Sequence, residues 1–213
     1  IGAYLGACTI SEQRFRELVG EHGWETLNMY LVELLDYGER LAWAEIDAMP
    51  DGSYEFTDHL DDDGITADQP VPIHLTITVK GDEIAYDFTG TSPQVKGGMN
   101  NAVGTAQAGV LTALRVMMDP DIPRNGGAFR PVTLTIPEGS LLNPHPPAPV
   151  ASRGGTIQRQ GDAMIGCQVP IRPEKLMACC SGTDTLINFG GYDRNGEPFI
   201  LMETHWGGWG GRH

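Results

Sequence analysis

An alternating apolar pattern on both sides of a short turn restricts the fold of this 213-residue sequence more than any other feature. Every second residue is apolar from 73 to 79 and again from 84 to 88, and Gly81-Asp82 between them is a two-residue turn signal. If that dipeptide is the whole loop, the predicted pairs are Val79–Ile84, Ile77–Tyr86, Leu75–Phe88, Lys80–Glu83, Thr76–Asp87 and His74–Thr89. All seven apolar side chains then share one face, and a slip of one residue would scramble both faces. The pattern predicts a β-hairpin over about residues 71–90.

Helical spacing of apolar residues indicates a packing helix before this hairpin. Leu27, Leu31 and Leu34 fall on one face of a predicted helix over about residues 24–49, and Pro50-Asp51-Gly52 stops it. Ser11 is expected to cap a shorter preceding helix, which Gly20 and Gly23 interrupt.

Two more helices and further strands follow the hairpin. Small residues predict a closely packed helix over about 101–118, ending before Asp119-Pro120, and a second helix over about 156–167. Residues 132–136 read as a strand, and a second hairpin is predicted over about 186–203. Hairpins interleaved with helices indicate an α+β fold with mixed, largely antiparallel sheets. We find no internal linker, so residues 1–213 are predicted to be a single fragment of a larger domain.

Composition excludes some classes of function. The net charge is −14 and the isoelectric point about 4.6, so the average surface would repel nucleic acid. No apolar stretch approaches the roughly 20 residues that span a membrane. The four cysteines form no C-x-x-C pair, which favours reduced core thiols in a cytoplasmic protein.

Glycine-rich loops between the first hairpin and the next helix are candidates for binding an anion. Residues 89–93 and 97–101 lead toward a helix N-terminus, where unpaired N–H groups stabilise negative charge. A capped helix behind a flexible loop is the structural alternative. Neither loop matches a nucleotide-binding glycine motif, so no ATP site is predicted on this chain.

Other polar groups have both a functional and a structural interpretation. The acidic run 58–63 fails the EF-hand pattern and is interpreted as a solvated turn. Arg153, Arg159 and Asp162 flank Gly154-Gly155, where they could recognise a carboxylate or phosphate or could only pin a helix. No G-x-S-x-G motif supports serine hydrolase chemistry.

Seven ordered blocks of sequence resemble the hydantoinase B/oxoprolinase family. They are Asp87-Phe-Thr-Gly-Thr-Ser92, Asn100-Asn101, Asn125-Gly126, Arg130-Pro131, Pro137-Glu-Gly-Ser140, Asn143-Pro144 and Asp162-Ala-Met. The family supplies the B-type subunit of ATP-dependent hydantoinases, 5-oxoprolinase and acetone or acetophenone carboxylases. Its members are longer on both sides, and their N-terminal metal region and C-terminal part have no counterpart here.

The resemblance implies an amidohydrolase that opens a cyclic amide such as hydantoin, N-methylhydantoin or 5-oxoproline through a phosphorylated intermediate. It places ATP on a hydantoinase A-type ATPase partner and a divalent metal in the N-terminal region. A ketone carboxylase and a scaffold segment that docks the ATPase are the alternatives. A stand-alone ligand-binding module is a third, and the isolated chain is expected to be inactive.

The resemblance also points to site residues. Asp87 and His74 are the catalytic candidates, because the predicted hairpin puts both on its polar face. The remaining candidates would hold the intermediate: Thr89, Gly90, Thr91, Ser92, Gly97, Gly98, Asn100, Asn101, Asn125 and Arg130. No metal ligand is predicted. Gly97–Asn101 is expected to border one cavity with Asn125 and Arg130.

Overall fold

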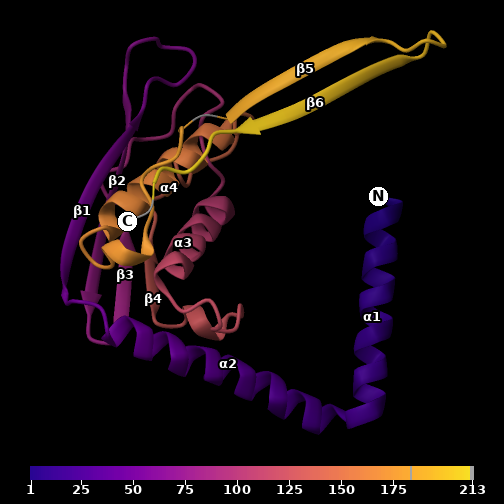
Figure 1. The fold of residues 1–213 in the computed structure, drawn as a ribbon, viewed down its shortest axis with the longest axis vertical. Helices are drawn as coiled ribbons and strands as arrows, with labels where there is room; N and C mark the ends of the chain where they lie inside the picture. The colour runs from indigo at the N-terminus through magenta and orange to yellow at the C-terminus, as the bar shows by residue number, and fades with distance from the viewer. Residues whose placement is uncertain (183, 212–213) are drawn as a thin grey trace.

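The computed structural model describes residues 1–182 and 184–211 (Figure 1). Its long helices are α1 (Gly2–His22), α2 (Trp24–Asp47), α3 (Val103–Met117) and α4 (Arg153–Gln168), with short 3-10 turns η1 (Gly127–Phe129) and η2 (Pro173–Lys175). The strands are β1 (Gly52–Leu60), β2 (Val71–Lys80), β3 (Glu83–Asp87), β4 (Val132–Thr135), β5 (Asp184–Tyr192) and β6 (Pro198–Trp206). The predicted α+β class is confirmed.

The first sheet has the strand order β1-β2-β3-β4. Strands β1, β2 and β3 pair antiparallel, and β4 joins β3 in parallel after the crossover through α3. The register of the first hairpin is the predicted one, with Val79 opposite Ile84 and Ile77 opposite Tyr86. The ladder ends at Asp87, so the expected Leu75–Phe88 and His74–Thr89 pairs lie beyond it. Phe88 instead donates its N–H to the carbonyl of Thr135.

The core lies between one face of this sheet and three helices. Ile73, Leu75 and Ile77 of β2 are fully buried, as the alternation requires. Ala42 and Ile46 of α2 join the same cluster, which also contains these buried residues of α3 and α4: Val110, Leu114, Met117, Ala163 and Cys167. The other face of the sheet stays polar and partly exposed.

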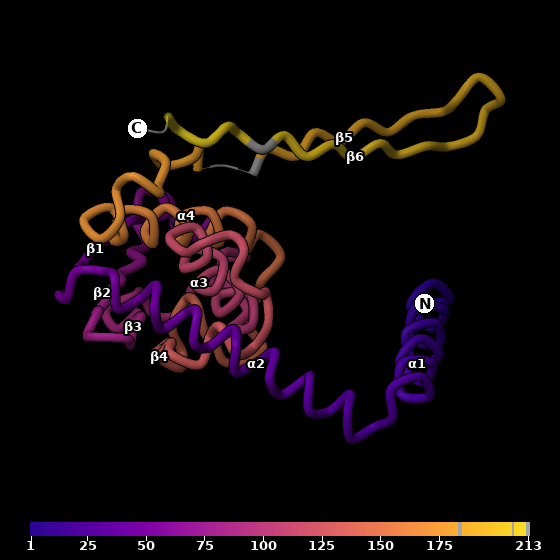
Figure 2. Tube along the Cα trace, turned by 60° about the horizontal axis from the view of Figure 1, so that its bottom comes forward, coloured from indigo at the N-terminus to yellow at the C-terminus, as the bar shows by residue number. Residues whose placement is uncertain are grey.

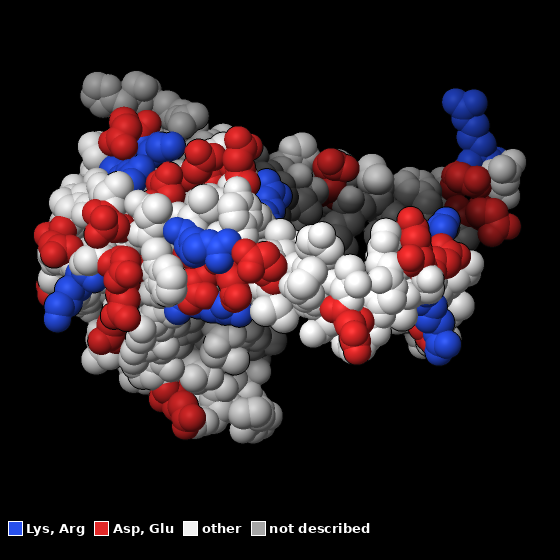
Figure 3. Space-filling model, turned by 90° about the horizontal axis from the view of Figure 1, so that it is seen from below, with Lys and Arg blue, Asp and Glu red and all other residues white. Residues whose placement is uncertain are grey.

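Two elements project from this body. Helix α1 turns away from α2 at Gly23, whose φ is 78°. Strands β5 and β6 form a hairpin that leaves the body on the side opposite α2 (Figures 1 and 2). None of the described residues of α1 is buried. Viewed from the side that carries α2, acidic and basic side chains are interspersed over the surface (Figure 3).

Two expectations near the N-terminus are wrong. The first helix does not start at Ser11; it begins at Gly2 and includes Gly20, and only Gly23 breaks it. The acidic turn begins later than expected and is not fully solvated, because residues 58–60 belong to strand β1 and Asp63 is buried. Asp58 occupies one of the inward positions of β1, so the strand lacks the regular apolar alternation by which a strand is predicted. This aspartate is neutralised by Arg159, which is 101 positions away in sequence and whose Nη1 lies 3.1 Å from its Oδ2.

Smaller differences concern helix ends and thiols. Helix α4 begins three residues before the predicted start, at Arg153, so Gly154 and Gly155 belong to its first turn. All four cysteines are free, and Cys167 is buried, whereas Cys8 and Cys179 are exposed. Among the described residues, no helix has the length and apolarity needed to cross a membrane.

Candidate functional site

A cavity of about 700 Å³ opens where the end of β1 meets the N-terminus of α4. Four segments that are distant in sequence form its wall. The lining residues are His59, Leu60, Asp61, Asp62, Met99, Ala151, Ser152, Gly154, Gly155, Arg159, Ser181, Gly182 and Leu186. This volume lies in the range typical of small-molecule sites.

Short hydrogen-bonded contacts fix the N-terminus of α4 at this position. The N–H of Ser152 donates to the carbonyl of Gly98 at 2.9 Å, and the hydroxyl of Thr156 donates to the carbonyl of Met99. Gly97 in turn lies against the backbone of Asp63. The glycine-rich loop therefore joins the start of α4 to the segment that follows β1.

The first turn of α4 supplies positive potential to the cavity. Ser152 makes no side-chain cap bond, and a helix N-terminus carries unpaired N–H groups and partial positive charge. Arg159 contributes less, because its guanidinium already contacts Asp58 and Asp162. Asp61 and Asp62 also line the cavity, and Asp62 Oδ1 accepts the N–H of Gly64 at 2.7 Å. The lining thus combines the N-terminus of a helix with two carboxylate side chains.

Arg159 and Asp162 also hold the base of the second hairpin. The N–H of Cys180 donates to Asp162 Oδ1 at 3.0 Å, and Gly182, with φ 71°, packs directly on the guanidinium of Arg159. Of the two interpretations of this group, pinning of secondary structure describes the observed contacts.

The predicted catalytic pair lies on the polar face of the sheet, outside the lining of this cavity. Asp87 Oδ1 accepts the N–H of Thr89 at 2.8 Å, which forms a local turn. His74 Nδ1 is 2.8 Å from Thr57 Oγ1, and the backbone of His74 exchanges two hydrogen bonds with the hydroxyl of Thr91. The structure therefore brings His74 beside Thr57 and Thr91, and its catalytic role stays a prediction.

The loop of residues 89–92 folds back onto the sheet. Gly90 has φ 98° and packs against the ring of His74. The N–H of Ser92 donates to the carbonyl of Pro72 at 2.9 Å. These contacts explain why the loop needs glycine and small polar residues without placing it at the cavity.

The asparagines of the next loop are buried. Asn100 accepts the N–H of Val95 at 2.8 Å, and its amide donates to the carbonyls of Val95, Gly97 and Pro149. Asn101 donates to Gln160 Oε1 at 3.2 Å. Both side chains hold the loop in shape, and Met99 is the residue of Gly97–Asn101 that lines the cavity.

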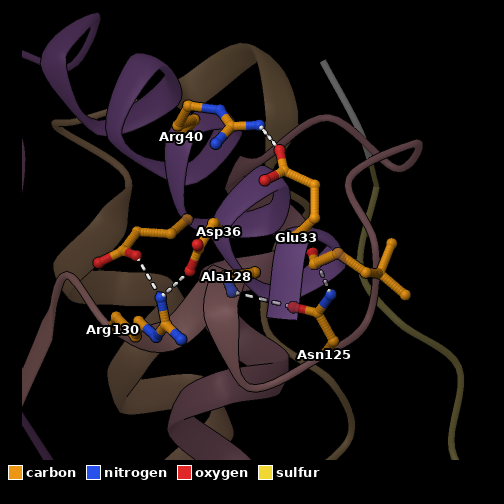
Figure 4. Close-up of polar contacts among 8 residues, drawn as sticks. Glu33, Asp36, Arg40, Asn125, Ala128 and Arg130 are labelled. Carbon is orange, nitrogen blue, oxygen red and sulfur yellow. Dashed lines mark hydrogen bonds and ion pairs between the residues drawn. The ribbon is translucent and has the colours of Figure 1, made fainter. Parts of the chain in front are cut away.

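Asn125 and Arg130 are not among the residues that line the cavity, and their polar contacts are with α2 and η1 (Figure 4). Asn125 donates to the carbonyl of Leu34 at 2.9 Å, and Arg130 Nη1 lies 2.7 Å from Asp36 Oδ1 and 2.5 Å from Glu39 Oε2. The expected shared cavity with Gly97–Asn101 is therefore not observed. These residues instead join η1 to α2.

Within the acidic turn after β1, backbone N–H groups of the turn itself donate hydrogen bonds to a carboxylate. Asp63 Oδ1 accepts the N–H groups of Thr66 and Ile65, and these bonds lower the pKa of the Asp63 carboxyl. In residues 1–182 and 184–211, no three His, Cys, Asp or Glu side chains converge so as to hold a metal ion.

The sequence does not predict that His59, Asp61, Ser152 and Ser181 are neighbours around one cavity. The glycine pair before the predicted helix was the available signal, because it marks a helix start without bulky side chains. Nothing local to the sequence shows that this start faces the end of β1.

A cavity at a helix N-terminus of an α+β body is a candidate small-molecule site. The chain matches the Hydantoinase B/oxoprolinase family over residues 1–213, and it belongs to that family.

Individual relatives agree with this membership. A protein of Pseudomonas sp. (strain NS671), provisionally named as the B-type subunit of a D-/L-hydantoinase, is 29% identical over 99% of this chain. The crystal structure of ATP-dependent caprolactamase from Pseudomonas jessenii matches 92% of the chain with a TM-score of 0.82 and 28% identity. A nucleotide-free acetone carboxylase structure shares the fold, with a TM-score of 0.77 and 18% identity over 95% of the chain. The chain spans only 37%, 34% and 30% of these three proteins.

Proposed function

We propose that this chain is the central segment of a B-type subunit of an ATP-dependent amidohydrolase that opens a cyclic amide. An ATPase partner of the hydantoinase A type would supply the phosphoryl group. Family membership and the hydantoinase and caprolactamase relatives support this assignment. The isolated chain is expected to be inactive, because it lacks that partner.

The observation that carries the proposal is that the start of α4 and two aspartates line the same cavity. The amide group that is opened has a carbonyl acceptor and an N–H donor. The first turn of α4, with Gly154 and Gly155, can donate to the carbonyl oxygen, and Asp61 and Asp62 can accept from the ring nitrogen. A simple ketone would use only the N-terminus of α4, so the arrangement favours the amide.

The same helix N-terminus suits an activated intermediate. An unstrained amide is poorly electrophilic, and transfer of the γ-phosphoryl group of ATP to its oxygen makes the ring carbon reactive and releases ADP. Water adds to that carbon, and the C–N bond of the adduct then breaks as the ring nitrogen takes up a proton, which opens the ring and leaves an acyl phosphate. A second water attacks the acyl carbon, and C–O cleavage releases inorganic phosphate that carries the original amide oxygen. Helix N–H groups would stabilise the phosphoryl oxygens, and enclosure would exclude bulk water.

Two alternatives make different predictions. A carboxylase of the acetone type would join CO₂ to an enol phosphate, and the acetone carboxylase structure shares this fold. A scaffold segment would dock the ATPase and leave the chemistry to other parts of the subunit. In that case filling the cavity would leave turnover intact.

Oxygen-isotope transfer in the full-length complex tests the proposal. The complex is incubated with ATP and an ¹⁸O-amide panel of hydantoin, 5-oxoproline and caprolactam, and in parallel with acetone and bicarbonate. Ring opening with ¹⁸O in the released phosphate supports the proposal. Carboxylation of acetone without ring opening, or ring opening with unlabelled phosphate, contradicts it.

A further inference from the structure

The β5–β6 hairpin carries apolar side chains on both of its faces. Antiparallel register assigns alternate residues to each face, because Phe189 pairs with Leu201 and Gly190 with Ile200. One face exposes Leu186, Tyr192, Ile200 and Met202, and the other exposes Phe189, Phe199 and Leu201. Ile200 is 82% exposed and Phe189 57%.

The hairpin has no other sheet to join among the described residues. Strands β5 and β6 pair with each other, and both views show them extending away from the body (Figures 1 and 2). Residues 185–192 and 198–202 contain no charged side chain, whereas 20% of the whole chain is charged. Exposed edge strands usually carry charges that prevent association, so this hairpin has the composition of an interface core.

Hydrogen bonds stabilise the tip of the hairpin. Asp193 and Glu197 close the turn, since the N–H of Asp193 donates to the carbonyl of Glu197 at 2.8 Å and Asp193 Oδ1 accepts the N–H of Glu197 at 2.9 Å. Nevertheless, a free two-stranded hairpin is at best marginally stable in water. A hairpin that is apolar on both faces therefore needs partners on both faces.

The comparisons favour the rest of a B-type subunit, beyond the segment matched here, as the partner that covers the hairpin. The caprolactamase match leaves 8% of this chain uncovered, about 17 residues, which is fewer than the span from Asp184 to Trp206. The hairpin therefore cannot lie wholly outside the match. About two-thirds of that caprolactamase chain lies beyond the matched part, within one polypeptide.

We propose that the β5–β6 hairpin inserts between apolar surfaces of the remaining part of its own B-type subunit, which covers both faces. The inference rests on the proposed function only in taking this chain as a segment of such a subunit. The subunit's own chain is the favoured occupant because it is tethered to the hairpin at high effective concentration.

Photo-crosslinking tests this in the full-length subunit assembled with its ATPase. Benzoylphenylalanine replaces Ile200 or the adjacent Leu201, which face opposite sides, and Asp82 in the exposed β2–β3 turn is the matched control. The expected result is a crosslink from each hairpin position to peptides of the same subunit outside residues 1–213, with the gel mobility of a single subunit. Circular dichroism of each labelled subunit checks that it is folded.

Crosslinks to the ATPase, a dimer of B-type subunits, crosslinking from one face only, or yields no higher than at Asp82 would each overturn the inference. The readout does not depend on turnover. An active complex without these crosslinks contradicts this inference alone, and an inactive complex with them contradicts the proposed function alone.

Discussion

Gly97 lies directly against the backbone carbonyl of Asp63: a Cβ atom placed on residue 97 would come within 1.6 Å of that oxygen. The contact holds the glycine-rich loop beside the segment that follows β1. Because the loop also accepts a hydrogen bond from Ser152 at the start of α4, the packing at Gly97 connects the segment after β1 to that helix.

Replacement of Gly97 by alanine is expected to destabilise the chain. The obstructing atom is backbone and cannot rotate away, so we expect a loss of about 1–3 kcal/mol in the free energy of unfolding. Gly98→Ala is the matched control, because its Cβ would lie 3.3 Å from Ser152 Oγ, which can adjust. Denaturant titration of both variants measures the difference, and equal stability would contradict the packing.

Removal of the Asn125 side chain is expected to loosen α2 without changing substrate affinity. Two hydrogen bonds join Asn125 to Leu34 and Ala128, and their loss should cost about 1–2 kcal/mol. Arg130→Gln should cost less than about 1 kcal/mol, because the ion pair is half exposed. Thermal unfolding measures the first effect, with exposed Asn28→Ala as control. A raised KM at unchanged stability would contradict this and show that Asn125 contributes to substrate binding.

The hydrogen bond between Gln168 and Tyr86 predicts a non-additive pair of variants. Gln168 Nε2 donates to the hydroxyl of Tyr86 at 3.0 Å, and both side chains are fully buried. Tyr86→Phe leaves that amide unsatisfied and should cost about 1–3 kcal/mol. Adding Gln168→Leu removes the unsatisfied group, so the double variant should recover part of the loss. A strictly additive double variant would show that the two groups do not interact.

Stability should fall in mildly alkaline solution because of Cys167. Burial raises the pKa of this thiol from 9.0 to about 11. The folded state therefore holds a proton that the unfolded state has lost between these values, and the contribution is complete below pH 9 and lost as the pH rises through 11. From pH 8 to pH 10 the wild-type chain should lose about 1 kcal/mol more than Cys167→Ser. Parallel pH dependences of the two proteins would contradict this.

The first hairpin could be predicted from the sequence because its register is a local property. Alternation and a two-residue turn fix which face each side chain occupies, and the observed pairs agree. Strand β1 was missed because Asp58 occupies an inward position. Its partner Arg159 comes from α4, so only the tertiary fold explains the charge.

The cavity could not be predicted in the same way. The sequence marked Gly97–Asn101 as a candidate anion-binding loop and placed Gly154-Gly155 near a helix start, but the resemblance to family blocks gave no information on which blocks meet. Asn125 and Arg130 follow Asn101 after helix α3, and their polar atoms pair with α2. Long-range packing separates them from the start of α4.

The most direct measurement of the central claim fills the cavity from its helical wall in the full-length complex. Gly155→Leu places a side chain where Cβ would lie 3.3 Å from Met99 Cε, and Gly161→Leu is the control on the same helix, with no atom within 4 Å of its Cβ. Both substitutions remove a glycine of α4, and the gain in helix propensity is larger at Gly161 in the interior than at Gly155 in the first turn. We predict that Gly155→Leu lowers kcat/KM for ATP-coupled ring opening by roughly tenfold or more, while assembly and the Gly161→Leu enzyme are unaffected. Full turnover by a folded Gly155→Leu complex would contradict the account.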